Sequence, residues 1–305
     1  MQTASKFSVL RVCARLALYN LPTLLICVAL FLYIGRAEEM RTSLSELVQV
    51  VGSESMRPTI GAIAEDFMTR NPRADITVRG GGSGDGIAAL LHGMVDIAMT
   101  SRDVTPRERA YVSDKGLELS MVPLALDAVV IVINQANPIT VLDVEQIRDI
   151  FAGKIRNWSE LHGAETEIVP FARAAGSGTA YLFGEHVLSA DSFAASVSHL
   201  STNEAIVAEV AARPGAIGYT GRGALRDAGN RVRMLAIRSN QQSPPTMATT
   251  ESIVSGSYPL SRKLSLVTTG HPLATAKAFV DFCLSASGQG LFQRAGYIEV
   301  QSAAR

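Results

Sequence analysis

Three glycine- and hydroxyl-rich turns stand out in this chain, and each leads directly into an apolar helical run. They are residues 52–58 (GSESMRP), 80–86 (GGGSGDG) and 173–179 (RAAGSGT). The first N–H groups of a helix lack intrahelical partners and carry a partial positive charge. Glycine lets the backbone come close to a ligand, and serine or threonine adds an O–H donor. Three such turns therefore predict a site where helix starts converge on a small oxyanion.

Enzymatic motifs do not account for these serines and glycines. No Gly-x-Ser-x-Gly elbow surrounds Ser83 or Ser177. Residues 80–86 lack the Gly-Lys-Ser/Thr of a phosphate-binding ATPase loop and the glycine spacing of a dinucleotide site. The five histidines are scattered, without the spacing of metal ligands. We therefore expect a protein that is not an enzyme, with no catalytic residues, no metal site and no cofactor.

The overall charge gives no sign of a nucleic-acid partner. Lys and Arg total 28 residues, as do Asp and Glu, so the formal net charge is zero, and only 6% of residues are aromatic. Nucleic-acid binders usually combine a basic surface with aromatic stacking residues. Charge recognition in this chain must therefore be local.

Residues 1–40 differ from the rest of the chain. Three basic residues precede an uncharged stretch at 16–35, and charged residues follow it. About 20 uncharged residues can just span a bilayer, and a basic flank keeps the start cytoplasmic so that the remainder is exported. Small residues before a cut after Ala37 are equally compatible with a cleaved signal peptide. We expect either a signal peptide or a membrane anchor. Cys13 and Cys27 lie in this segment, which leaves Cys283 without an intramolecular disulfide partner in the mature domain.

From residue 47 onward, strands and helices alternate. Apolar and β-branched runs predict strands at 47–51, 75–79, 96–99, 124–134, 167–171, 231–237 and 264–268, with a further strand after the turn at 214–219. Helical spacing predicts helices at 58–70, 87–93, 144–151, 181–188, 204–212 and 273–284. Strands separated by helices of this length predict parallel βαβ units and an α/β fold.

Seven segments, in one order along the chain, resemble the periplasmic phosphate-binding proteins (PstS-type) that serve bacterial phosphate ABC transporters. They are residues 52–56, 80–86, 96–102, 150–158 (IFAGKIRNW), 173 with 176–179, 214–219 (PGAIGY) and 279–285 (FVDFCLS) with 288–289. The resemblance covers roughly residues 48–300. It depends on the order of the segments, because each segment alone is a weak to moderate signal.

The resemblance implies a two-lobe fold of the type II periplasmic binding protein class, with a ligand cleft between the lobes. One lobe would hold residues 46–127 and 258–305, the other residues 128–257, and the lobes would close by a hinge motion. The implied function is extracytoplasmic capture of inorganic phosphate, or a close tetrahedral oxyanion, by a monomer that passes the ion to an ABC permease and ATPase complex. The protein would be periplasmic or extracytoplasmic, and attached to the inner membrane if the N-terminal helix is uncleaved.

The resemblance also implies which residues face the ion. From the first lobe these would be Ser55, Met56, Ser83 and Ser101, and from the second lobe Arg173, Ser177, Gly178 and Thr179. Met56 and Gly178 would act through their backbone N–H groups, and Arg173 would supply a planar, fully charged donor. Arg102 is expected either as a second cation for the ligand or as a residue that holds Asp103 or a neighbouring loop.

One position departs from the family pattern. Many members have an aspartate where Ser101 stands, and that carboxylate accepts the proton that hydrogen phosphate carries and sulfate lacks. Ser101 can still accept a hydrogen bond, and Asp103 or Asp85 could lie near enough to do so. Oxyanion binding is therefore expected more firmly than strict selectivity for phosphate. A membrane-anchored phosphate sensor or regulator, and a phosphate-releasing hydrolase, stay open as alternative functions.

Overall fold

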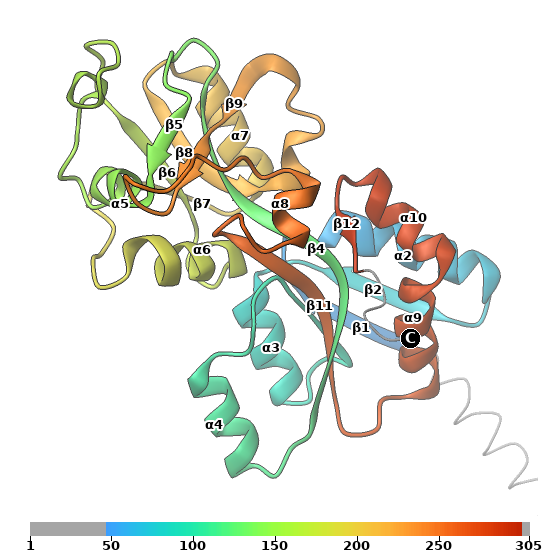
Figure 1. The fold of residues 1–305 in the computed structure, drawn as a ribbon. Coiled ribbons are helices and arrows are strands. Elements are labelled where there is room, and N and C mark those ends of the chain that lie inside the picture. Colours follow the sequence, from blue (N-terminus) through green and yellow to red (C-terminus); the bar gives the residue numbers. More distant parts are fainter. Residues whose placement is uncertain (1–46, 301–305) are drawn as a thin grey trace, which may run out of the picture. The chain divides into compact units, whose positions relative to one another are not determined.

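The computed structural model describes residues 47–300, which form mixed α/β structure (Figure 1). The strands are β1 (Leu47–Gly52), β2 (Asp75–Arg79), β3 (Ile97–Thr100), β4 (Leu119–Asn134), β5 (Val141–Asp143), β6 (Val169–Arg173), β7 (Ser198–Leu200), β8 (Ala216–Gly221), β9 (Val232–Met234), β10 (Ala236–Arg238), β11 (Ser261–Thr269) and β12 (Ile298–Glu299). The α-helices are α2 (Arg57–Arg70), α3 (Ser83–Leu91), α4 (Pro106–Asp114), α5 (Val144–Phe151), α6 (Gly178–Phe183), α7 (Asn203–Ala212), α8 (Thr250–Val254), α9 (Ala274–Leu284) and α10 (Ala286–Arg294).

The predicted signal peptide or anchor at residues 1–40 lies outside the described residues. Among residues 47–300, no helix combines the length and the apolar character needed to cross a bilayer.

A mixed sheet runs through the described chain in the order β2-β1-β3-β11-β4-β8-β6-β7. At one end β1 and β3 are parallel, and at the other end β6 is parallel to both β7 and β8. These are the predicted parallel units. The middle of the sheet is antiparallel, because β11 returns between β3 and β4 and pairs antiparallel with both, while β4 pairs antiparallel with β8.

Two main hydrophobic cores lie on either side of this antiparallel middle and define two lobes. The core of the first lobe uses β1, β2, α2, α9 and α10, and its buried residues run from Val48 to Leu124–Ala125 and from Leu264 to Phe292. The core of the second lobe uses buried residues between Ala128 and Leu260. Strand β4 passes from one core to the other, and all of its residues from Ala128 to Ile133 are fully buried. The α/β, two-lobe fold is thus confirmed, whereas the exact lobe boundaries 46–127, 258–305 and 128–257 stay a prediction.

Most predicted elements are present, but several end or divide at unexpected points. Helix α3 begins at Ser83, so that the glycine turn itself forms its first turn. The predicted helix 181–188 is divided between two elements: its first residues belong to α6, which ends at Phe183, and the rest form a π-helical turn at Gly184–Leu188. The predicted strand 231–237 is two strands, because β9 pairs with β4 while β10 pairs with β5 in a separate sheet.

Helix α4 was not predicted, and its composition explains why. It buries no residue, so it lacks the apolar periodicity that marks a helix packed on a core. Its start is instead fixed locally by a capping box, in which Thr105 and Glu108 each accept a hydrogen bond from the other's backbone N–H.

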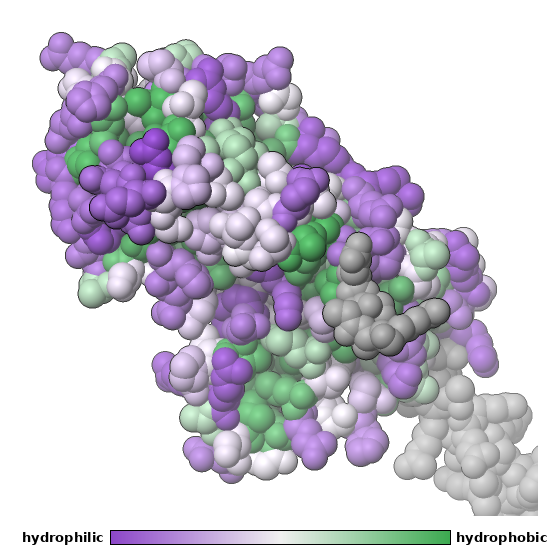
Figure 2. Space-filling view, viewed as in Figure 1, coloured by the Kyte–Doolittle hydropathy of each residue, from purple (hydrophilic) through white to green (hydrophobic). Residues whose placement is uncertain are grey.

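On the face drawn in Figure 2, hydrophobic side chains gather between α3 and α4, whereas the surface over α5 and β5 is mostly hydrophilic.

Candidate anion-binding site

The three predicted turns meet at the junction of the two lobes. Within the first lobe, the Gly82 N–H donates to the Gly52 carbonyl oxygen at 2.9 Å. Across the lobes, the Gly84 N–H donates to the Gly176 carbonyl oxygen at 3.0 Å. The turns at 52–58, 80–86 and 173–179 therefore converge, as their composition predicted.

Glycine is required where these turns touch. Gly82 has φ +116°, and a Cβ there would lie 2.7 Å from the Gly176 carbonyl oxygen. A Cβ on Gly178 would lie 2.4 Å from the Ser101 Oγ and 2.5 Å from the Ser83 Oγ. Any side chain at either position would push the lobes apart, so these glycines permit the close approach of one lobe to the other.

A group of buried hydroxyls lies beside this contact. The Ser83 Oγ accepts a hydrogen bond from the Ser101 N–H at 3.0 Å and lies 3.3 Å from the Ser101 Oγ. On the second lobe, the Ser177 Oγ accepts from the N–H groups of Thr179 and Ala180 and so caps α6. Gly178 follows Ser177 in the chain, and its backbone N–H has no acceptor among residues 47–300. Hydroxyls and an amide donor from both lobes thus face one another.

Met56 contributes less than expected. Its side chain is fully buried in the first-lobe core. Its backbone N–H, the predicted ligand donor, already donates to the Ser53 carbonyl oxygen at 3.1 Å. Met56 therefore shapes the first turn and anchors it to the core in this structure.

Arg173 lies at the end of β6 with only 2% of its surface exposed. Its guanidinium donates to the carbonyl oxygens of Ser201 at 2.7 Å and Leu200 at 3.4 Å, and to the side-chain oxygen of Asn203. All of these acceptors are neutral. Burial, and after it the positive charge of Arg262, lower the pKa of Arg173 to about 10. The group stays charged at neutral pH, but no carboxylate of residues 47–300 bonds to it.

Arg102 is placed quite differently from the expected second cation. Its guanidinium makes two bonds with the Glu108 carboxylate, at 2.7 and 2.8 Å, and donates to the Asp103 carbonyl oxygen at 2.8 Å. It also stacks over the Tyr181 ring, 4.9 Å from the centroid. Of the two roles predicted for Arg102, the geometry fits the second, in which it holds Asp103 and the start of α4. We therefore leave it out of the ligand set proposed below.

The pairing also changes the protonation of Glu108. Burial alone would raise the pKa of this carboxyl, but hydrogen bonds from Arg102 and the Thr105 N–H hold the pKa below its ordinary value of 4.5. The side chains of Asp85 and Asp103, the two carboxylates considered as proton acceptors, are both exposed. Neither belongs to the buried group of hydroxyls.

Three buried polar residues in the site were not predicted from the sequence: Asp127, Asn203 and Arg262. Asn203 begins α7, and its amide donates to the Ser55 Oγ at 2.9 Å across the lobes. Arg262 donates to the Thr179 Oγ1 at 2.8 Å and to the Ser55 Oγ at 3.2 Å. Of the three, Asp127 left a recognisable signal, because it is the lone charge within the apolar run 124–134.

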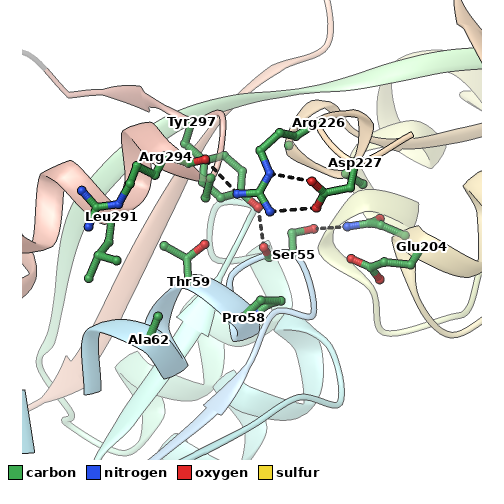
Figure 3. A pocket seen from close by; sticks show the side chains of 14 residues that line it. Ser55, Pro58, Thr59, Ala62, Glu204, Arg226, Asp227, Leu291, Arg294 and Tyr297 are labelled. Atoms are coloured by element: carbon green, nitrogen blue, oxygen red, sulfur yellow. Dashed lines mark hydrogen bonds and ion pairs between the residues drawn. The ribbon is translucent and has the colours of Figure 1, made fainter. Parts of the chain in front are cut away.

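A pocket of about 500 Å³ opens beside Ser55 and Asn203. Figure 3 shows Ser55, Pro58 and Thr59 on the α2 side, with Glu204 opposite. Arg226 lies above them and is held by the Asp227 carboxylate at 2.7 Å. The pocket thus borders two buried polar residues of the lobe junction, Ser55 and Asn203. Within residues 47–300, no group of three or more His, Cys, Asp or Glu side chains is arranged to hold a metal ion.

Comparisons with known proteins show the family of this chain. A family model described as a PBP superfamily domain matches residues 37–287. Phosphate-binding protein PstS of Bacillus subtilis is 32% identical over 252 residues, which cover 82% of this chain and 80% of that protein. A crystal structure from Clostridium perfringens, described as a phosphate ABC transporter substrate-binding protein with bound phosphate, is 30% identical with a TM-score of 0.73, covering 84% of this chain and all of that one.

A second solved structure is similar in the same way. It is described as an ABC-type phosphate transport receptor from Vibrio cholerae, is 29% identical with a TM-score of 0.67, and covers 82% of this chain and 99% of that one. The family model spans well over half of the chain, and the Bacillus subtilis relative is alike over about four fifths of both sequences. The chain therefore belongs to the PBP superfamily, and within it to the PstS-type phosphate-binding proteins.

Proposed function

We propose that this protein is a non-catalytic extracytoplasmic receptor that binds inorganic phosphate, or a close tetrahedral oxyanion, between its lobes. The observation that carries the proposal is the buried Arg173 guanidinium, whose hydrogen-bond acceptors are all neutral. A buried charge that is not bonded directly to an opposite charge is costly. Arg262 adds a second buried positive charge and Asp127 one negative charge, so the three groups together carry one net positive charge. A small anion would offset it.

The ligand set that we propose combines this charge with neutral donors from both lobes. Hydroxyls and one amide surround the lobe junction, and they can donate to the oxygens of a tetrahedral ion. The set is Ser55, Ser83, Ser101, Arg173, Ser177, Gly178 and Thr179. Ser177 acts mainly by capping α6, which fixes the position of Gly178 and Thr179. Met56 supports the turn from the core.

The relatives support the identity of the ion and the biological role. The Bacillus subtilis relative is named a phosphate-binding protein, and the Clostridium perfringens structure is described with phosphate bound. By analogy, the ion captured here would pass to an ABC permease and ATPase complex. Function outside the cytoplasm follows from the same analogy, with residues 1–40 acting as a cleaved signal or as a retained inner-membrane anchor. A mass measurement of the exported protein distinguishes these two fates.

Isothermal calorimetry of the purified protein with phosphate, sulfate and molybdate tests the proposal. We expect micromolar phosphate binding, which corresponds to a binding free energy of about −8 kcal/mol. Several charge-assisted hydrogen bonds favour binding, and the costs of desolvating the anion and closing the lobes oppose it. Arg148→Gln is a suitable control, because this arginine pairs on the surface with Glu145 and Asp149. The control should bind as the wild type does. A wild-type protein that binds none of the three ions would contradict the proposal, and turnover of a chromogenic phosphate ester would contradict its non-catalytic part.

A further inference from the structure

Asp127 and Arg262 form a buried ion pair on the two strands that join the lobes. They are direct cross-strand neighbours in the antiparallel register of β4 and β11. The Asp127 Oδ2 accepts from the Arg262 Nη2 at 2.6 Å and from the Nε at 3.0 Å, and each side chain is only 1% exposed. The carboxylate thus fixes one edge of the guanidinium. The opposite edge is left to face the lobe junction.

The two Nη atoms of Arg262 reach the proposed ligand residues of both lobes. The Nη1 donates to the Thr179 Oγ1 of the second lobe at 2.8 Å, and the Nη2 donates to the Ser55 Oγ of the first lobe at 3.2 Å. A guanidinium has five N–H donors, and these contacts with the two to Asp127 use four of them. The remaining N–H, on Nη1, has no acceptor among residues 47–300. Arg262 therefore keeps a donor for a further acceptor at this point.

The environment of Arg262 is also electrostatically suited to an anion. Its charge acts on Arg173, since it is the second-largest cause of the lowered pKa of that residue. Gly221 leaves room for the guanidinium, because a Cβ there would lie 2.7 Å from the Arg262 Nη2 and 3.1 Å from the Asp127 Oδ2. The guanidiniums of Arg173 and Arg262 are thus close enough to repel one another, and of the two only Arg262 is bonded to the Asp127 carboxylate. An anion in contact with both would relieve their repulsion.

We propose that Arg262, held by Asp127 on the strands between the lobes, is a second guanidinium that contacts the bound oxyanion directly and bridges the hydroxyls of the two lobes around it. The inference rests on the proposed function, because it assigns a further contact to the same ion. It gives the strands between the lobes a part in ligand capture.

Phosphate titrations of Arg262→Gln and Arg262→Lys test this contact, with Arg102→Gln as the matched control. Arg102 is also a buried arginine bound to a carboxylate, but it faces Glu108 and not the hydroxyls. We expect roughly ten- to hundredfold weaker phosphate binding for Arg262→Gln, because one charged hydrogen-bonding group is lost. The lysine variant should recover part of that loss by keeping the charge. Arg102→Gln should bind within about twofold of wild type.

A single substitution at Arg262 leaves the Asp127 carboxylate buried and unpaired, which can unfold the protein. The double variant Arg262→Met with Asp127→Asn removes both charges and separates folding from binding. We expect this double variant to be folded, as shown by a cooperative unfolding transition in circular dichroism. Its phosphate affinity should nevertheless be at least about tenfold lower than that of wild type. Wild-type affinity in this folded double variant would overturn the inference and leave the proposed function intact. Failure of the wild-type protein to bind phosphate would instead overturn the proposed function, and this inference with it.

Discussion

Arg102 and Arg173 occupy matching places in the two lobes, yet their surroundings differ. Arg173 is the last residue of β6 and Arg102 follows the end of β3 by two residues, and both are buried. Arg102 is held by the Glu108 carboxylate, a carbonyl oxygen and an aromatic face. Within the described part of the chain, the guanidinium of Arg173 donates only to neutral oxygens, from Leu200, Ser201 and Asn203. The same residue type is therefore bonded directly to a carboxylate in the first lobe, whereas in the second lobe its hydrogen-bond acceptors are neutral.

This difference indicates how a guanidinium becomes a binding group. A paired guanidinium has a carboxylate that neutralises its field and occupies its donors, so an incoming anion would compete with that carboxylate. A guanidinium bound to neutral oxygens keeps its net charge, and an anion adds attraction without displacing a counter-ion. The contrast predicts that Arg173 acts on ligand binding and that Arg102 acts on stability.

The largest effect is expected when Arg173 and Arg102 are each replaced by glutamine in separate variants. Arg173→Gln should weaken phosphate binding by roughly ten- to hundredfold, because a charged donor is lost from a buried site. Arg102→Gln should keep nearly full affinity but lower the free energy of unfolding by about 1 to 3 kcal/mol, because the Glu108 carboxylate loses its partner. Calorimetry and urea unfolding of both variants give the four values needed. Equal losses of affinity in the two variants would remove the contrast.

An intermediate effect is expected at Ser101, which packs against both Ser83 and Gly178. Ser101→Asp would place a carboxylate among these groups, where it can accept the proton of hydrogen phosphate but repels the fully deprotonated sulfate ion. We expect the preference for phosphate over sulfate to rise by roughly tenfold. Competition titrations with the two ions measure this ratio. Ser101→Ala is the matched control for the lost hydroxyl, and an unchanged ratio in the aspartate variant would mean that position 101 does not face the ion.

The sequence was sufficient for the parts of the site that depend on local chemistry. Glycine-rich turns before helices are recognisable without a structure, and the three turns do meet at the lobe junction. The apolar run at 124–134 correctly predicted a strand, and in β4 all of these residues except Leu126 are buried. These features depend on backbone conformation and burial, which neighbouring residues largely determine.

Pairings between distant residues could not be read in the same way. Arg262 bonds to Asp127, which is 135 positions away, and the contact exists because β11 returns beside β4 in one register. The partner of Arg102 is only six positions away, but it lies on α4, a helix without the apolar periodicity that would have predicted it. The predicted strand 231–237 failed for a related reason, since its two halves pair with different strands. For Arg262 and for residues 231–237, the tertiary arrangement decided between local options of similar stability. Helix α4 is the exception, because its start is fixed locally by the Thr105–Glu108 capping box.

The smallest effect should appear in the pH dependence of stability at Glu108. The pKa of this carboxyl in the folded protein lies below its ordinary value of 4.5, owing to Arg102 and the Thr105 N–H acting against burial. A carboxyl whose folded pKa is depressed stabilises the protein above its unfolded pKa, and this contribution is lost as the pH falls through the folded value. Glu108→Gln should therefore be less stable than wild type at neutral pH, by up to about 1 kcal/mol because the pair is partly exposed. The free energies of unfolding of the two proteins should begin to converge as the pH falls below 4.5, and should meet once Glu108 is protonated in the folded protein. Urea unfolding over this range measures the difference, and a gap that stays constant with pH would mean that the Arg102 pair does not stabilise the charged form of Glu108. Because no carboxylate of residues 47–300 bonds to Arg173, the difference in stability between Arg173→Gln and wild type should show no comparable change over the same acid range.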